Sequence, residues 1–391
     1  MKRWVFAMVV CWPLLASGQE SRGLKGVWKK FQAWMDSSAV RKVDRNYIEV
    51  PERPWRVVLR TKTDEFKMDV DSYFDDEYLE EKFGHEVDDG RFQWQQRYNP
   101  PAAQSVGFYA GYRGLGFSYS YYLRKKTGRS FSISSTGARY GLNFRLRRFK
   151  TNDVHVDAQL YEGDQEVDRV EGDGSSYDDI WVRSVIIDGY YLFNGRRFSQ
   201  AAAYNQSVIQ RRSAGSLMVG AMYHQSSLDL ASDRNAAVIQ MNGDWGKFSI
   251  RQLNLGVGYG YNWVPGRGWL LNAMVMPTVS VFNRVKTHYY DSNYALFYDD
   301  LSEEDKATHK PFPADLEDES WLNDARIWET RTETKYSNLK LNMDARLSVT
   351  YNWKRCFVNV FGQFNTFEYG YSRTDVSITD WYVRASFGTR F

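Results

Sequence analysis

The stretch that decides the fold is Leu339–Trp353, which reads LKLNMDARLSVTYNW. Its residues alternate between apolar and polar throughout, and this period of two places the apolar side chains on one face of a β-strand. Strands usually have about five or six residues, and a tilted strand of about ten residues crosses the hydrocarbon core of a bilayer. The length and alternation therefore predict a membrane-spanning strand and argue against the alternative of a soluble, secreted β-sandwich.

The same alternation recurs at Leu253–Trp263, Leu115–Leu123 and Trp269–Val281. Beyond the N-terminus no apolar run is long enough for a membrane helix, and such a chain can cross a bilayer only as a closed barrel. We predict an all-β fold, an antiparallel up-and-down barrel of about twelve strands, with ten or fourteen as alternatives. The expected strands are 55–63, 104–112, 115–124, 129–147, 153–161, 181–193, 215–229, 249–263, 268–285, 337–353, 356–371 and 376–391.

The connections between these strands differ in length, and in bacterial outer-membrane barrels short turns are periplasmic and long loops extracellular. A change of phase within 129–147 predicts a β-bulge near Gly137. One connection on the short-turn side, 194–214, is unusually long and contains four arginines. Short turns are expected at 113–114, 265–267 and 354–355, and long loops at 64–103, 162–180, 230–248 and 286–336.

Two segments of the long loops are strongly acidic, at 64–89 and 299–319. Carboxylates can bind Ca²⁺ or Mg²⁺, but neither segment has EF-hand spacing, and the scattered histidines form no zinc pattern. We interpret these acidic residues as solvent-exposed charge and predict neither a metal site nor a cofactor. The formal net charge is only +3, and no nucleic-acid partner is expected.

The first 18 residues have the features of a secretory signal peptide. Lys2 and Arg3 precede the apolar run 4–15, and small residues follow at 16–18. The apolar run is too short to span a membrane. We expect three parts: a signal peptide at 1–18, a periplasmic segment at 19–54, and a barrel with long acidic extracellular loops at 55–391.

Within the periplasmic segment, apolar residues at helical spacing predict a short amphipathic helix at 24–35. It could lie on the inner leaflet of the outer membrane, close the periplasmic mouth, dock a periplasmic partner, or simply pack against the barrel base. The residues that define it are Leu24, Val27, Trp28, Phe31, Trp34 and Met35.

The last strand alternates to the end of the sequence, with Phe387 and Phe391 on its apolar face. A final strand that ends in an aromatic residue resembles the signal read by the outer-membrane barrel assembly machinery. With the signal peptide, it predicts a location in the bacterial outer membrane. The expected partners are that machinery, outer-membrane lipids and lipopolysaccharide.

Charged residues gather on the polar faces of the strands, which would line the lumen. They indicate either a narrow, anion-selective pore or a closed interior held by salt bridges, because narrow barrels can fill with side chains. Both interpretations describe a non-enzymatic protein of the cell envelope. The predicted lumen cluster comprises Arg56, Arg60, Arg145, Arg346, Arg384, Asp344 and Asp380.

The alternative function is a lipid-modifying hydrolase of the outer membrane, with a site built from His224 and Ser226 or from His155 and Asp157. Side chains at i and i+2 on a strand lie about 7 Å apart, whereas a general base must lie about 3 Å from its nucleophile. A hydrolytic site would therefore need partners from neighbouring strands, and ordinary lining of the lumen is the simpler interpretation.

Four stretches resemble a family of Gram-negative outer-membrane β-barrel proteins known only as a domain of unknown function. The resemblance extends from about residue 44 to the C-terminus. It implies the fold and the location, and it supplies no catalytic positions. The stretches are 44–60 (DRNYIEVPERPWRVVLR), 111–123 (GYRGLGFSYSYYL), 187–198 (IDGYYLFNGRRF) and 203–220 (AYNQSVIQRRSAGSLMVG).

Overall fold

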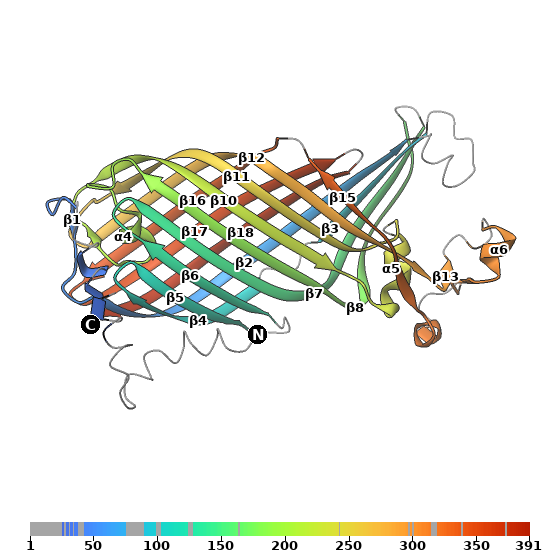
Figure 1. Cartoon of the computed structure of the whole chain (residues 1–391), viewed down its shortest axis with the longest axis horizontal. Coiled ribbons are helices and arrows are strands. Elements are labelled where there is room, and N and C mark those ends of the chain that lie inside the picture. Colours follow the sequence, from blue (N-terminus) through green and yellow to red (C-terminus); the bar gives the residue numbers. More distant parts are fainter. Residues whose placement is uncertain are drawn as a thin grey trace.

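The computed structural model shows a closed antiparallel barrel with strongly tilted strands (Figure 1). The predicted signal peptide at 1–18 lies outside the described residues, as do Leu24, Val27, Trp28, Phe31 and Trp34 of the predicted helix. The described residues are 26, 29–30, 32–33, 35–37, 43–75, 90–98, 103–123, 128–162, 165–241, 243–295, 298, 301–313, 319–337, 339–371 and 374–391.

Twelve strands form the ring, as predicted, and the pairing of β18 with β2 closes it. Closure gives each ring strand a hydrogen-bonded neighbour strand on both of its sides within the ring. In order, the ring strands are β2 (Trp55–Asp75), β4 (Ala103–Tyr112), β5 (Leu115–Tyr122), β6 (Arg129–Thr136), β7 (Tyr140–Glu162), β8 (Gln165–Leu192), β10 (Ala214–Asp229), β11 (Trp245–Trp263), β12 (Trp269–Ser292), β16 (Leu341–Trp353), β17 (Cys356–Tyr371) and β18 (Thr374–Arg390).

The remaining elements lie at the two ends of the ring. Among the described residues, no helix is long and apolar enough to cross a membrane. These elements are β1 (Ile48–Glu49), β3 (Gly90–Tyr98), β9 (Ile209–Gln210), β13 (Tyr294–Ala295), β14 (Lys310–Pro311), β15 (Ile327–Tyr336), α4 (Gln200–Tyr204), α5 (Ala236–Met241), α6 (Glu303–Lys306) and the 3₁₀ turns η2 (Asp233–Asn235) and η4 (Glu319–Asn323).

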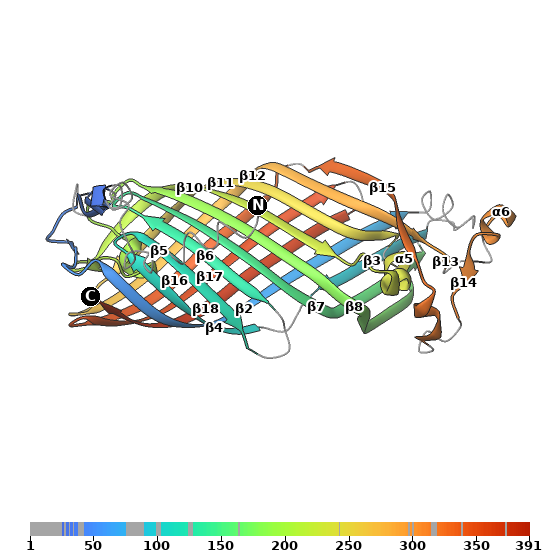
Figure 2. The ribbon, with the colours of Figure 1, turned by 60° about the horizontal axis from the view of Figure 1, so that its bottom comes forward.

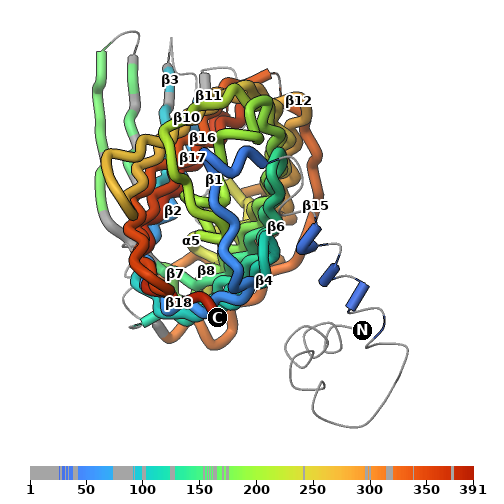
Figure 3. Tube along the Cα trace, turned by 90° about the vertical axis from the view of Figure 1, so that its left-hand side faces the viewer, coloured from blue at the N-terminus to red at the C-terminus, as the bar shows by residue number. Residues whose placement is uncertain are grey.

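The two ends of the barrel differ as the sequence predicts. At one end, here called the turn end, β4–β5, β11–β12 and β16–β17 are joined by the predicted short turns. Gly268 adopts a φ of 84° in one of them, a conformation that favours glycine. The other end, here called the loop end, carries the extended parts of β3, β7 and β8 together with α5 (Figure 2). Seen from the turn end, the ring is closed and β1 lies across it (Figure 3).

The predicted single strand 129–147 is wrong. It is a hairpin of β6 and β7, in which the Gly137 N–H donates to the Tyr140 carbonyl at 2.8 Å. The predicted separate strand 153–161 is also wrong, because it continues β7. A tight turn shifts the alternation of side chains as a bulge does, so the change of phase was misinterpreted. The two errors cancel in the strand count.

Several predicted loops contain strand. Residues 64–75 belong to β2, and β8 begins at Gln165 within the predicted loop 162–180. β3 pairs with the outer parts of β2 and β7, and β15 pairs with the outer part of β12. The barrel wall therefore extends well beyond the predicted strand ends, and these segments of the predicted acidic loops form its outer part.

The wall changes polarity along its length. Near the turn end, large apolar side chains point outward, as with Leu347, which is 65% exposed, and Phe108. Near the loop end, apolar side chains point inward, as with Met68, which is 1% exposed, while the alternating residues Lys67 and Asp69 lie outside. Polar residues line the lumen near the turn end and apolar residues fill it near the loop end.

Candidate functional site: the filled lumen

The long connection between β8 and β10, residues 193–213, folds into the turn end of the barrel. We call it the plug. Ser199 caps the N-terminus of its short helix α4, and the Ser199 side chain accepts a hydrogen bond from the Ala202 N–H at 3.3 Å. Phe198, Ala202 and Ala203 are buried. The sequence predicted an unusually long connection here, and the structure shows that it fills the lumen at this end.

Lumen side chains hold the plug through its backbone. Arg384 Nη2 donates to the Tyr204 carbonyl at 2.9 Å, and Arg390 Nη2 donates to the Gln206 carbonyl at 3.1 Å. Arg56 donates to the Asn205 carbonyl. These carbonyls lie at the C-terminal end of α4, where helix carbonyls lack partners within the helix. Arg56 and Arg384, both members of the predicted lumen cluster, thus hold the plug through its carbonyl groups.

The mouth of the barrel is covered by the chain that precedes β2. β1 pairs with β9 of the plug, and Arg211 forms an ion pair with Glu49. The residues described between 26 and 37 are helical. Asp36 accepts a hydrogen bond from Arg113 Nε at 2.6 Å, at the β4–β5 turn. Asp36, one residue beyond the predicted helix 24–35, thus joins this helical segment to the turn end of the barrel.

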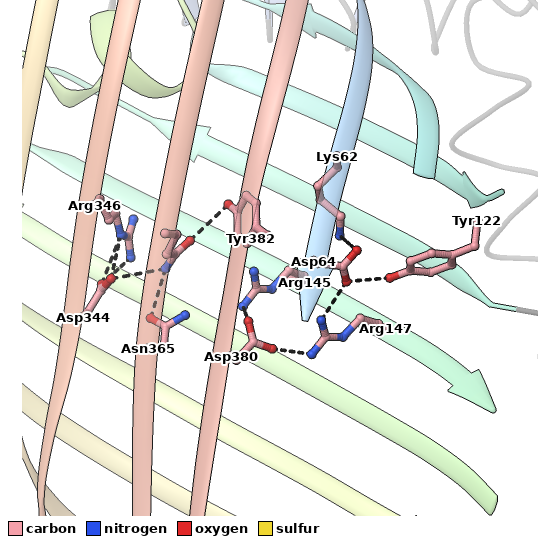
Figure 4. A network of polar contacts seen from close by, with 11 residues as sticks. Lys62, Asp64, Tyr122, Arg145, Arg147, Asp344, Arg346, Asn365, Asp380 and Tyr382 are labelled. Atoms are coloured by element: carbon pink, nitrogen blue, oxygen red, sulfur yellow. Dashed lines mark hydrogen bonds and ion pairs between the residues drawn. The ribbon is translucent and has the colours of Figure 1, made fainter. Parts of the chain in front are cut away.

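Next to the plug, on its loop-end side, lies a buried network of ion pairs. Figure 4 shows the residues of this network. Arg147 bridges Asp64, at 2.7 Å, and Asp380. Arg145 pairs with Asp380 at 2.9 Å, and Lys62 pairs with Asp64 at 3.4 Å. The network joins β2, β7 and β18 across the lumen.

A second part of the network is centred on Arg346. Its guanidinium contacts Asp344 at 2.6 Å and Asp188 at 3.0 Å. Gln363 donates to Asp344 at 3.3 Å and accepts a hydrogen bond from Tyr382. Each of these lumen carboxylates therefore has a cationic partner, which offsets the cost of its burial.

The predicted lumen cluster thus points inward, but it divides into two groups. Arg145, Arg346, Asp344 and Asp380 belong to the ion-pair network, whereas Arg56, Arg60 and Arg384 lie beside the plug. Sequence reasoning missed Lys62 and assigned Asp64 to a loop. The uninterrupted alternation of β2 through these two residues is the signal that could have found them.

A large apolar cluster fills the lumen nearer the loop end. Its members come from most of the ring strands, and α5 contributes Ile239. Beyond it, Ala236 and Ala237 pack with Tyr294 and Trp321. The cluster includes Phe66, Met68, Val70, Ile180, Ile186, Met222, Phe248, Ile250, Phe367, Tyr369 and Ile378.

His224 lies within this apolar cluster. Its ring stacks on Phe367 with centroids 3.9 Å apart, and its Nδ1 lies 2.9 Å from the Tyr369 hydroxyl. Ser226 Oγ donates to the Arg183 carbonyl at 3.4 Å. His224 is fully buried, and among the described residues its hydrogen-bond partner is Tyr369, with no bond to Ser226.

The second pair considered for hydrolysis, His155 and Asp157, lies on the outer part of β7. His155 Nε2 is 3.5 Å from Glu171, and Asp157 binds Arg169 at 2.8 Å. The structure therefore places the two candidate pairs in different surroundings. Among the described residues, no group of three or more His, Cys, Asp or Glu side chains could hold a metal ion.

The two residues of the predicted assembly signal point outward. Phe387 is 52% exposed and Phe391 is 56% exposed, and both lie in the apolar part of the wall near the turn end. Phe391 also closes the ring through its backbone, which pairs with Trp55.

The fold and the filled lumen define a class, the closed antiparallel barrel whose outer surface is apolar near the turn end. Residues 61–391 match the family described as Domain of unknown function (DUF4421), and the chain belongs to that family. No curated protein matches the chain.

Among solved structures, the chain is similar to the outer-membrane protease OmpT from Escherichia coli, with 8% identity, a TM-score of 0.34, and coverage of 88% of this chain and 98% of that one. It is also similar to the translocator domain of the autotransporter NalP from Neisseria meningitidis, with 8% identity, a TM-score of 0.30, and coverage of 94% of this chain and 96% of that one. For the COG4313 outer-membrane channel from Pseudomonas putida F1, the identity is 9%, the TM-score is 0.28, and the coverage is 88% of this chain and 98% of that one. These structures are bacterial outer-membrane barrels with different activities.

Proposed function

We propose that this chain is an outer-membrane barrel with a closed lumen, which serves the cell envelope as a non-enzymatic structural or interaction protein. The observation that carries the proposal is the filling of the lumen by the plug, the ion-pair network and the apolar cluster. The location rests on the exposed apolar wall near the turn end, which suits contact with lipid.

The orientation follows from the same features. We place the turn end in the periplasm, with the segment 19–54 below it, and the loop end outside the cell. The signal peptide at 1–18 would direct export. Outer-membrane lipids and lipopolysaccharide would contact the apolar wall, and Phe387 and Phe391 would present the strand end to the barrel assembly machinery.

Single-channel recording in a planar bilayer tests closure directly. The folded protein, verified by a heat-dependent shift of its gel band, should produce no regular conductance steps. A closed lumen gives this result because ions find no continuous water path past the plug and the apolar cluster. Reproducible steps from the folded protein would contradict the proposal and favour the narrow pore.

Cysteine labelling gives an independent reading in intact vesicles. In a Cys356→Ser background, Ser348→Cys places a thiol in the buried lumen and Ser302→Cys places one on the exposed cap of α6. A water-soluble maleimide should label Ser302→Cys and spare Ser348→Cys. Equal labelling of both variants would show that a molecule as large as the maleimide enters the lumen, which would contradict its closure.

A further inference from the structure

Four arginines face the lumen beside the plug, on the adjacent strands β2 and β18. Arg390 is paired in register with Arg56, and Ser386, two residues beyond Arg384, is paired with Arg60. We call Arg56, Arg60, Arg384 and Arg390 the arginine cluster. Arg56, Arg60 and Arg390 are at most 5% exposed. Among the described residues, none of the four forms an ion pair with a carboxylate.

The neighbouring ion-pair network does not neutralise the cluster. That network contains four cations, Lys62, Arg145, Arg147 and Arg346, and four carboxylates, Asp64, Asp188, Asp344 and Asp380. Its positive and negative charges are equal in number, so each of its carboxylates already has a cationic partner. The arginine cluster therefore holds four positive charges without a counter-charge, and buried charges are usually paired because their burial is costly.

The guanidinium groups also have unused hydrogen-bond donors. The Nε atoms of Arg56, Arg60 and Arg384 and the Nη1 atom of Arg390 are buried without a partner in the described structure. Arg60 has no hydrogen bond to any described residue, and its guanidinium lies 3.8 Å from the centre of the Tyr109 ring. Such stacking is only a partial substitute for an anion. Arg384 rests in the same way on Phe361, at 4.8 Å.

The plug carbonyls occupy only some of the donors. Arg384, Arg56 and Arg390 each donate to the backbone between Tyr204 and Gln206. Carbonyl oxygens carry partial charge and supply no net negative charge. Arg60 contacts none of them, so a group with a full negative charge beside Arg60 and Arg384 would satisfy donors that the protein leaves free.

We propose that Arg60 and Arg384, flanked by Arg56 and Arg390, bind a phosphate-type oxyanion inside the barrel. Guanidinium groups present a planar fork that matches phosphate oxygens in pairs. Four positive charges attract such an anion, and the attraction grows with the product of the charges. The anion is either free phosphate or the phosphate of a lipid headgroup.

This inference goes beyond the proposed function, because a closed structural barrel does not require unpaired cations. Conductance tests whether the lumen is closed, and binding tests whether the cluster takes an anion. Either result can fail while the other holds, so the two failures are distinguishable.

Calorimetric titration of the whole purified protein, in detergent and phosphate-free buffer, tests the site. Inorganic phosphate is one probe, and a short-chain phosphatidylglycerol below its micelle concentration is the other. We expect saturable binding at one per barrel for at least one probe. Arg60→Gln and Arg384→Gln should each weaken that binding by about tenfold or more, as expected when charge-assisted hydrogen bonds are lost.

Arg251→Gln is the matched control, because Arg251 lies on the exposed face of β11 and should not alter binding. A heat-dependent gel shift verifies folding. If a glutamine variant fails to fold, Arg60→Lys and Arg384→Lys replace it; they retain the charge, lose the fork, and should weaken binding as well.

Each outcome decides the proposal. Binding of inorganic phosphate that depends on Arg60 and Arg384 supports a site for a free oxyanion. Binding of phosphatidylglycerol alone, with the same dependence, supports a site for a lipid headgroup. Absence of binding for both probes, or binding that survives these substitutions in folded protein, overturns the site.

Discussion

The two halves of the barrel wall are built on opposite patterns, and β18 shows the difference within one strand. Near the turn end, Phe387 points outward and Arg384 points inward. Near the loop end, Ile378 is buried inside while Asp375 is exposed outside. The side chains of this strand alternate between outside and inside along its whole length. The apolar ones lie on the outward face near the turn end and on the inward face near the loop end.

The difference indicates two surrounding media. Near the turn end, an apolar exterior suits lipid, and the lumen must then satisfy its polar side chains by ion pairs and hydrogen bonds. Near the loop end, a polar exterior suits water, and the lumen packs like the core of a soluble β-protein. The ion-pair network lies where the two patterns meet, between the plug and the apolar cluster.

The largest expected effect comes from breaking the network at that boundary. Arg147→Leu removes the partner that Asp64 and Asp380 share, which leaves buried carboxylates poorly compensated. Removing one partner of a buried pair typically costs about 3–5 kcal/mol. Urea unfolding in lipid vesicles should show a loss of that size.

Arg148→Leu is the control for this prediction, because Arg148 is the next residue of β7 and is exposed. Its effect should stay below about 1 kcal/mol, as is usual for surface substitutions. Similar losses for both variants would mean that the network contributes little to stability.

A smaller effect should distinguish the outer surface of the wall near the turn end from the outer surface near the loop end. Ala385→Arg places a charge among the outward apolar residues of β18, and Ser377→Arg places one on its outward polar part, next to Glu368. Lipid-facing arginine costs about 2–4 kcal/mol near the bilayer midplane and about 0–1 kcal/mol near the interface. Ala385→Arg should therefore lose stability in vesicle unfolding while Ser377→Arg changes little. A reversed order would place the membrane around the other half of the barrel.

The alternation made the ring predictable from sequence, because strands between lipid and a polar lumen carry a period-two signal. The same rule failed beyond the apolar wall. Phe66, Met68 and Val70 alternate with polar residues just as regularly, but the acidic composition of this segment led to its prediction as a loop. Composition outweighed periodicity there, and periodicity was the better guide.

The plug and the pairing of charges were less predictable. Residues 193–213 have no periodic pattern, and α4 is too short to be stable without the wall around it. Arg147 and Asp380 are 233 residues apart in sequence, and only closure of the ring brings them together. The inward direction of Arg346, Asp344 and Asp380 could be predicted from the alternation, whereas the identity of each partner could not.

The smallest expected effect concerns an exposed ion pair at the loop end, between Lys310 and Asp324, which contrasts with the buried network. Asp324 accepts hydrogen bonds from Lys310 Nζ and from the Tyr294 hydroxyl, each at 2.6 Å. These contacts lower the pKa of Asp324 below its usual value, with the Lys310 hydrogen bond the largest cause and the Tyr294 hydrogen bond the next. A carboxyl group with a lowered pKa stabilises the folded state above its unfolded pKa of about 3.9, and this contribution is lost as the pH falls through its folded value.

Hydrogen exchange of the segment 319–327 should therefore increase between pH 5 and pH 3, after correction for the intrinsic rates. The increase should be less than about tenfold, because the pair is exposed and screened by water. Asp324→Asn should remove the pH dependence, because the amide does not titrate in this range. An undiminished pH response in Asp324→Asn would assign the effect to another carboxyl group. An increase comparable with that of global unfolding would show that the exposed end is coupled to the buried network, and that the two halves of the wall do not act as separate parts.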